Sequence, residues 1–154
     1  LKGLILSDTH SFADDNKGKQ KRFDSIQAVL KYGKRPFSIG FAENIFSEKS
    51  LEIKQDAVEL IKSIIRRSSI ESICATHLAL ASRTDTTSLL SSINIPTLVI
   101  KGKEDKLVTQ EQLDALLNHI RNVQYQEFEY SGHLPNLEES EKFNIVMNEF
   151  LTKI

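Results

Sequence analysis

The chain has 154 residues, of which 40% are hydrophobic and 27% are charged, and its formal net charge is −1 at pH 7. This composition is typical of a globular domain and excludes a disordered or fibrous chain. The near-zero charge and the lack of a Lys/Arg stripe argue against nucleic-acid and membrane partners, and no apolar run approaches the ~20 residues that cross a bilayer.

The first part of the chain predicts a short strand followed by a helical segment. Leu4-Ile5-Leu6 is apolar and ends at the polar Ser7, as expected for a strand buried on both faces. From about residue 14 to residue 82, apolar residues recur at three- and four-residue steps, which is helical periodicity. Four helices are predicted there, with apolar faces formed by Phe23, Ile26, Val29 and Leu30, by Phe37, Phe41, Ile45 and Phe46, by Ile53, Ala57, Leu60, Ile61, Ile64 and Ile65, and by Ile70, Ile73, Cys74, His77, Leu78 and Ala81.

Two features refine this helical segment. Gly33 followed by Pro36 is expected to end the first helix. Cys74 is the one cysteine, so an internal disulfide and a cysteine-based metal site are excluded, and its apolar neighbours predict a buried thiol.

After Arg83 the pattern alternates between strands and helices. Asp85 is placed to cap a short helix that holds Leu89 and Leu90. The β-branched run from Thr97 to Ile100 predicts a strand that Gly102 closes.

The remaining elements are a helix, a strand and a closing helix. Thr109 with Gln112 has the form of a capping box that opens a helix. Residues 123 to 129 alternate apolar and polar side chains, which is typical of a strand nearer the sheet edge. The apolar face of the closing helix is formed by Phe143, Val146, Met147, Phe150, Leu151 and Ile154.

The order of these elements predicts a parallel sheet. Strands that alternate with helices favour parallel pairing through crossover connections. The long helical segment between the first and second strands predicts a helical insertion above that sheet.

The carboxyl ends of two consecutive strands carry a carboxylate and an imidazole. In open parallel sheets functional groups gather at this edge, so Asp105 and His133 are predicted to be neighbours. A carboxylate beside a histidine fixes its tautomer and makes it a general base. Gly132 permits a sharp turn that would direct the ring over the sheet. On spacing alone, the alternative that Asp105 is a capping residue and His133 an unrelated surface histidine is equally favoured.

The sequence around these two residues resembles α/β-hydrolases over the whole chain. The run from Ile95 to Asp105 closely resembles their strand and acid loop. Gly132-His133 with Asn136-Leu137-Glu138 is similar to their histidine loop, which the last helix follows. Within the superfamily the similarity is greatest to 3-oxoadipate enol-lactonase-like esterases.

The resemblance implies a fold and a set of site residues. The fold is the C-terminal part of an α/β-hydrolase, a short parallel sheet of about three strands flanked by helices with a helical cap insertion. Residues 1–8 and 83–154 would form a partial core and residues 9–82 the cap, within about five residues. Asp105 would be the triad acid and His133 the general base, with no metal or organic cofactor. The positions implied to line the substrate pocket are His10, Phe12, Leu107 and Leu134.

The nucleophile of the family is missing from the sequence. It lies in Gly-x-Ser-x-Gly, and no two of the six glycines (3, 18, 33, 40, 102 and 132) are four residues apart. The chain is therefore expected to be the C-terminal fragment of a serine hydrolase for a small ester or lactone, inactive without its N-terminal half. The open edge of the first strand predicts a homo-oligomer of the fragment. No signal peptide is visible, and we expect a cytoplasmic protein.

Other functions stay open at this point. A non-catalytic binding or interaction domain on the same fold is favoured by the missing nucleophile and disfavoured by the presence of both Asp105 and His133. Haloperoxidase-like and C–C-bond-cleaving members of the superfamily share the acid and the histidine. A dehalogenase is less favoured, and its aspartate nucleophile would distinguish it.

Overall fold

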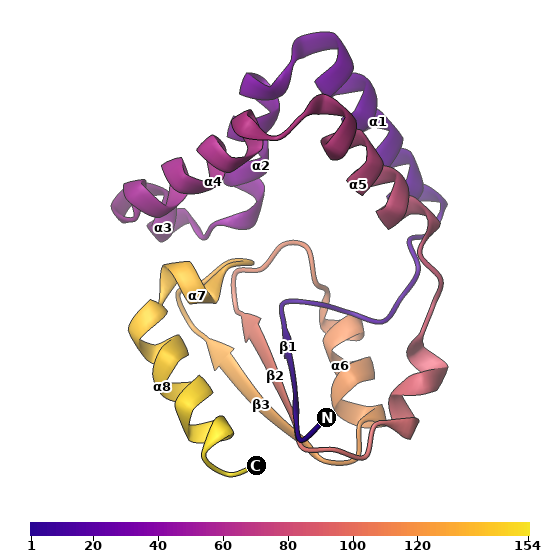
Figure 1. The fold of residues 1–154 in the computed structure, drawn as a ribbon, viewed down its shortest axis with the longest axis vertical. Helices are drawn as coiled ribbons and strands as arrows, with labels where there is room; N and C mark the ends of the chain where they lie inside the picture. Colours follow the sequence, from indigo (N-terminus) through magenta and orange to yellow (C-terminus); the bar gives the residue numbers. More distant parts are fainter.

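A computed structural model describes all 154 residues and contains a parallel three-stranded sheet with helices on both faces and beyond one end (Figure 1). The strands are β1 (Leu4–Ser7), β2 (Thr97–Gly102) and β3 (Val123–Phe128), in the order β1-β2-β3. Leu4 is in register with Thr97, and Thr97 with Val123. These observations confirm the fold class expected from the sequence.

The two faces of the sheet are covered by different helices. Side chains alternate along a strand, so Val99 faces one side while Leu98 and Ile100 face the other. Val99 packs against η1 (Thr87–Ser92) and α6 (Gln110–His119), whereas Leu98 and Ile100 pack against α8 (Ser140–Leu151). All six residues of β2 are buried, and burying a Leu, Ile or Val side chain stabilises the fold by about 1.5–3 kcal/mol.

Five helices between β1 and β2 form what we call the helical lobe. They are α1 (Asn16–Tyr32), α2 (Lys34–Ile45), α3 (Glu48–Ile53), α4 (Gln55–Arg67) and α5 (Ile70–Ser82). The carboxyl ends of the strands point towards this lobe, whereas both chain termini lie at the opposite end of the sheet (Figure 1). The lobe has a core of its own, formed by Ala42, Ile45, Phe46 and Val58. None of the helices combines the length and the apolar composition that a membrane span requires.

The helical lobe differs from the sequence prediction at two boundaries. The apolar stripe from Ile53 to Ile65 was expected on one helix, but Lys54 (φ −110°, ψ 45°) separates α3 from α4. Pro36 lies in the first turn of α2, where a missing backbone N–H costs nothing, so Gly33 alone ends α1.

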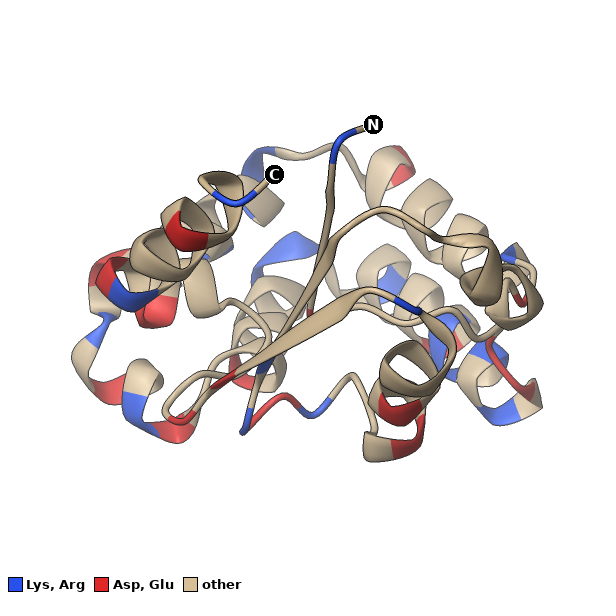
Figure 2. Cartoon of the chain, turned by 90° about the horizontal axis from the view of Figure 1, so that it is seen from below, with Lys and Arg blue, Asp and Glu red and all other residues tan.

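Packing within the lobe also departs from the prediction. Leu60 and Ile64 on α4 are each 46% exposed, so part of the predicted apolar face has no covering element. Cys74 is half-buried, not fully buried. Acidic and basic residues are interspersed over the helices (Figure 2).

Of the two capping signals in the sequence, the one at α6 is confirmed, whereas the N-cap of η1 is Thr86 and Asp85 lies one residue before it. Thr109 and Gln112 form the expected capping box at the start of α6. Asp85 accepts a hydrogen bond from the backbone N–H of Thr87, the first residue of η1, at 2.8 Å. Between α8 and β3 lies α7 (Pro135–Glu138), a single turn that the sequence did not predict.

Candidate active site

Three loops leave the carboxyl ends of β1, β2 and β3 and bring three titratable side chains together. One ligand atom from each of Asp8, Asp105 and His133 lies within 4.8 Å of the others. These residues are far apart in sequence and meet because parallel strands end at a common edge of the sheet. The site therefore faces the helical lobe.

The Asp105–His133 pair is joined by a partly buried hydrogen bond. Nδ1 of His133 lies 3.1 Å from Oδ2 of Asp105, whose side chain is 0% exposed. A carboxylate only accepts, so Nδ1 carries the proton and Nε2 of the neutral ring is an acceptor. Nε2 has no partner within the chain, and the His133 side chain is 28% exposed. The pair therefore presents a free basic nitrogen to the space above the sheet.

The electrostatics of the pair favour a charged imidazole beside an ionised carboxylate. Burial raises the pKa of Asp105, but the hydrogen bonds from His133 and from the Leu107 N–H at 2.7 Å outweigh it, and the net pKa is lowered. Burial likewise lowers the pKa of His133, while the hydrogen bond to Asp105 and its charge raise it, and the net pKa is raised. Both directions describe an acid that stabilises the imidazolium.

A buried carboxylate holds the backbone on both sides of His133. Glu138 is 3% exposed and accepts three backbone N–H groups, from Ser47 at 2.8 Å, Gly132 at 2.9 Å and Leu134 at 3.1 Å. Two of these residues flank His133, and Ser47 belongs to the helical lobe. Glu138 therefore fixes the histidine loop and fastens it to the lobe.

Gly132 is needed for close packing and not for a special turn. The chain bends at Gly132 and His133 as expected, but the bend does not require a glycine, because the glycine with a positive φ is Gly33 and not Gly132. A Cβ atom on Gly132 would lie 2.5 Å from the carbonyl oxygen of Ile45 and 2.8 Å from the nitrogen of Ser47. The same carbonyl accepts the N–H of His133 at 2.7 Å. The glycine therefore allows the histidine loop to touch the helical lobe.

Asp8 is a member of the site that the sequence did not single out. It is 5% exposed, Oδ1 accepts the Gly102 N–H at 2.8 Å, and Oδ2 accepts the Ser7 hydroxyl at 2.9 Å. Burial raises its pKa to about 7, although these two hydrogen bonds lower it. Its position at a strand end was the one available signal in the sequence.

The three side chains could offer a cation two carboxylates and an imidazole. All four carboxylate oxygens of Asp8 and Asp105 already accept hydrogen bonds, from Gly102, Ser7, Leu107 and His133. Such complete pairing stabilises the cluster as a hydrogen-bonded network.

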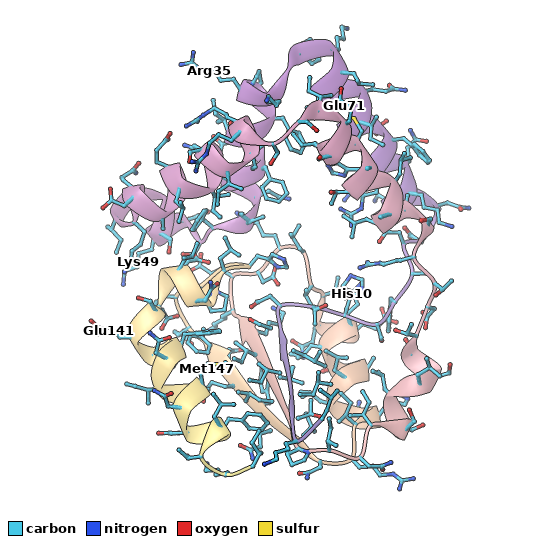
Figure 3. All side chains as sticks on the ribbon, viewed as in Figure 1. His10, Arg35, Lys49, Glu71, Glu141 and Met147 are labelled. Carbon is cyan, nitrogen blue, oxygen red and sulfur yellow. The ribbon has the colours of Figure 1, made fainter.

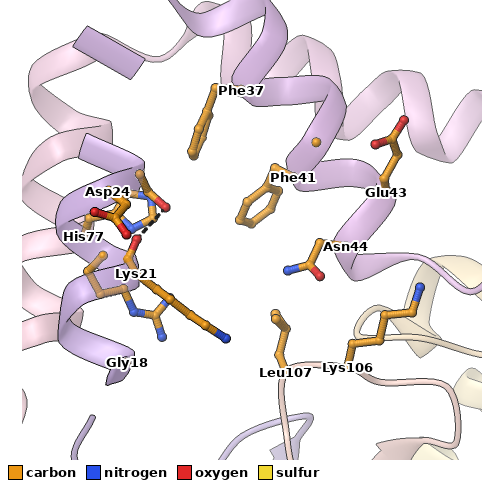
Figure 4. Close-up of a pocket in the computed structure, with 13 residues that line it drawn as sticks. Gly18, Lys21, Asp24, Phe37, Phe41, Glu43, Asn44, His77, Lys106 and Leu107 are labelled. Atoms are coloured by element: carbon orange, nitrogen blue, oxygen red, sulfur yellow. Dashed lines mark hydrogen bonds between the residues drawn. The ribbon is translucent and has the colours of Figure 1, made fainter. Parts of the chain in front are cut away.

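A cavity of about 790 Å³ lies between the helical lobe and the acid loop. Leu107, a predicted pocket residue, lines it from the loop, and Lys106 lies beside it (Figure 4). Phe37 and Phe41, with ring centroids 5.9 Å apart, form its apolar wall, and the ring of His77 meets Phe37 edge-on. The sequence placed these three lobe residues on helix faces but did not identify them as cavity residues.

The other predicted pocket residues do not line this cavity. His10 lies on the loop after β1, on the side towards the helical lobe, where its Nε2 accepts a hydrogen bond from Arg83 at 2.7 Å (Figure 3). The ring centroids of Phe12 and His10 are 6.4 Å apart, and Leu134 packs against the core of the helical lobe. Substrate contact by these residues stays a prediction.

The fold and part of the sequence match known hydrolases. The family profile described as "Serine hydrolase (FSH1)" matches residues 45–143. A stretch of 72 residues is 35% identical to 3-oxoadipate enol-lactonase 1 of Acinetobacter baylyi and covers 47% of this chain and 27% of that protein.

Solved structures match nearly the whole chain. A thermophilic esterase from Thermogutta terrifontis superimposes with a TM-score of 0.90 at 29% identity, over 99% of this chain and 56% of that one. The enol-lactonase from Burkholderia xenovorans superimposes with a TM-score of 0.86 at 20% identity, which shows the fold alone, over 99% and 56%. The chain thus spans little more than half the length of these enzymes. Because the family profile matches more than half of it, the chain belongs to the serine hydrolase (FSH1) family and has the α/β-hydrolase fold.

Proposed function

We propose that Asp105 and His133 are the acid and the general base of a Ser-Asp-His triad, in a hydrolase that cleaves a small ester or lactone. One observation carries this proposal: the hydrogen bond between Nδ1 of His133 and the fully buried carboxylate of Asp105, which leaves Nε2 free. In a triad the acid holds this tautomer and Nε2 takes the serine proton. The similarity to an esterase and an enol-lactonase supports the substrate class.

The nucleophile of the proposed triad is not among these 154 residues. The sequence contains no Gly-x-Ser-x-Gly, the motif that presents the serine in this fold. The chain corresponds to 56% of the Thermogutta esterase chain. We place the serine and the oxyanion-hole N–H groups in a segment of the whole protein that is not part of this chain.

The proposed reaction is acyl transfer through the missing serine. His133 removes the hydroxyl proton as the oxygen attacks the carbonyl carbon, and Asp105 stabilises the resulting imidazolium. The same proton then passes to the leaving alkoxide, which departs as an alcohol from an ester and stays attached to the acyl group after ring opening of a lactone. His133 next removes a proton from water, which attacks the acyl-enzyme, and returns that proton to the serine oxygen as the acid is released. No metal or organic cofactor takes part.

The helical lobe is proposed to act as a cap, with residues 9–82 as the cap and residues 1–8 and 83–154 as the partial core. Phe37, Phe41 and Leu107 form the apolar part of a cavity that polar and charged side chains otherwise line, and we propose that this part contacts the apolar portion of a substrate. A cap that closes over the substrate would exclude bulk water. We propose that His10, Phe12 and Leu134 contribute to the same pocket.

The chain alone is expected to turn over no ester. Removing a triad member leaves roughly 10³–10⁴-fold catalysis over water, and that remainder depends on the oxyanion hole, which is also missing. The assay is p-nitrophenyl ester hydrolysis by the purified chain, with His133→Gln as a blank for contaminating esterases. Turnover by the chain that its His133→Gln variant lacks would contradict this expectation.

The triad itself is tested in the protein that carries this chain together with a serine motif. A fluorophosphonate probe should label that serine, and His133→Gln should abolish labelling. Asp105→Asn should lower kcat by about 10⁴-fold, since the wrong tautomer then faces the serine. Asp114→Asn makes the same chemical change at an exposed position of α6 and is the matched control. Unchanged kcat/KM in the His133 variant would refute the proposed triad, whereas a protein that shows neither labelling nor turnover would favour a binding domain.

A further inference from the structure

Asp8 is held in a backbone conformation that its residue type rarely adopts. Its φ is +47°, and it is the one non-glycine residue of the chain with a positive φ. Such a conformation costs energy and persists only where the surrounding structure enforces it. The Asp8 N–H donates to the carbonyl of Ile100 at 2.9 Å, so this residue still belongs to the pairing of β1 with β2. The unusual turn comes directly after that pairing and directs the carboxyl group back over the end of β2.

The carboxyl group of Asp8 holds the strand end from which the acid loop starts. It accepts the N–H of Gly102, the last residue of β2, at 2.8 Å across 94 positions of sequence. The acid loop begins at the next residue, and Asp105 lies in it. The link therefore fixes the base of that loop.

The same carboxyl group lies beside the Asp105–His133 pair. Its oxygen is within 4.8 Å of the carboxylate of Asp105 and of the imidazole of His133. Two carboxyl groups and an imidazole in one buried cluster change each other's charge, because little water separates them.

We infer that Asp8 is a positioning residue for the Asp105–His133 pair and the third ionisable group of a coupled cluster, in which its charge sets the pH range where His133 acts as a base. The catalytic part of this inference rests on the proposed triad. An ionised Asp8 favours the imidazolium form of His133, and a protonated Asp8 does not. The burial that raises the pKa of Asp8 to about 7 places this change within the range where histidines titrate.

Other charged groups also act on this cluster, and they are the same residues in the wild type and in Asp8→Asn, so the difference between the two titration curves reports on Asp8. On β2 the ammonium group of Lys101 acts on Asp105, and on α7 the carboxylate of Glu138 acts on His133. The remaining titratable groups that interact with the cluster are His10, on the loop after β1, and Tyr125, on β3.

The test is the titration of the His133 ring in the ¹⁵N-labelled chain by NMR, from about pH 5 to about pH 9. His133→Gln assigns the resonance among the four histidines. In the wild type we expect the titration curve to have a second inflection near pH 7, where Asp8 ionises. In Asp8→Asn the curve should have one inflection, with a lower midpoint. Asp114→Asn, the matched control on α6, should overlay the wild type.

A curve for Asp8→Asn that superimposes on the wild type would overturn the inference. Should this variant fail to fold, the ¹³C signal of the Asp8 carboxyl in the wild type gives the answer. A carboxyl midpoint that coincides with the second inflection of His133 supports the coupling, and one near pH 4 overturns it. These measurements need no turnover, so their outcome is separate from that of the serine-labelling test. In the active protein, Asp8→Asn should move the acidic limb of kcat/KM to lower pH and leave KM unchanged.

Discussion

Replacing Asp8 with asparagine removes a buried ionisable group and keeps its shape. Asparagine tolerates a positive φ better than other non-glycine residues. Its side-chain oxygen can still accept the Gly102 N–H, and its amide can donate to the Ser7 hydroxyl in place of accepting from it. The variant therefore isolates the charge of Asp8 from the packing around it.

The magnitude follows from the pKa of Asp8. Burial raises it from 3.8 to about 7, so between these values the folded chain keeps a proton that the unfolded chain has released. The folded state then binds more protons, and stability falls as pH rises from about 4 to about 7. At about 1.4 kcal/mol per pKa unit, the loss on Asp8 alone is about 4 kcal/mol. Asp8→Asn has no carboxyl group at this position and does not lose this stability. Its free energy of unfolding minus that of the wild type should therefore be about 4 kcal/mol larger at pH 8 than at pH 4.

The assay is urea unfolding followed by circular dichroism, with wild type, Asp8→Asn and Asp114→Asn measured from about pH 4 to about pH 8. At a slope of about 2 kcal/mol/M, the midpoint of Asp8→Asn relative to the wild type should rise by about 2 M across this range. Asp114→Asn should follow the wild type at every pH. A difference between Asp8→Asn and wild type that does not change with pH would show that Asp8 titrates normally, and would refute the reasoning.

Three further outcomes are expected. Glu138→Gln should destabilise the chain by about 3 kcal/mol in urea unfolding, because an amide N–H₂ group then faces backbone donors. An unchanged unfolding midpoint, or an equal loss of stability in the exposed control Glu141→Gln, would contradict this. Gly132→Ala should lower the free energy of unfolding by about 1–3 kcal/mol, since its Cβ meets the Ile45 carbonyl, and a melting temperature equal to wild type would refute it. Light scattering should find the chain as a dimer or larger oligomer that forms through the open edge of β1. Ile5→Pro removes an N–H that points outward from this edge, so the variant should have a smaller particle mass than the wild type. A monomeric wild type would exclude pairing through this edge.

The pairing of Asp105 with His133 could be predicted because it depends on local patterns and one general rule. Each residue follows a recognisable strand, and neighbouring parallel strands end at the same edge of the sheet. The strand signals are strong, since the run that begins at Thr97 is β-branched and apolar, and both of its faces are buried. The resemblance to α/β-hydrolases rests on the same two loops.

The helical lobe was predicted less well, because periodicity locates apolar faces but not the surfaces that cover them. The stripe from Ile53 to Ile65 has helical spacing throughout, yet Lys54 interrupts the helix. Exposed Leu60 and Ile64 show the same effect, since the spacing of a residue does not say whether another element packs on it.

The sequence by itself determined the strands, the capping of α6 and the neighbouring positions of Asp105 and His133, because these depend on interactions within a few residues or on the common direction of parallel strands. Only the tertiary structure decided the pKa of Asp8, the three N–H groups that Glu138 accepts and the contact of Gly132 with Ile45. Each of these includes at least one contact between groups far apart in the chain, such as Asp8 with Gly102 at 94 positions and Glu138 with Ser47 at 91. Burial of a charged group is in addition a property of everything packed around it.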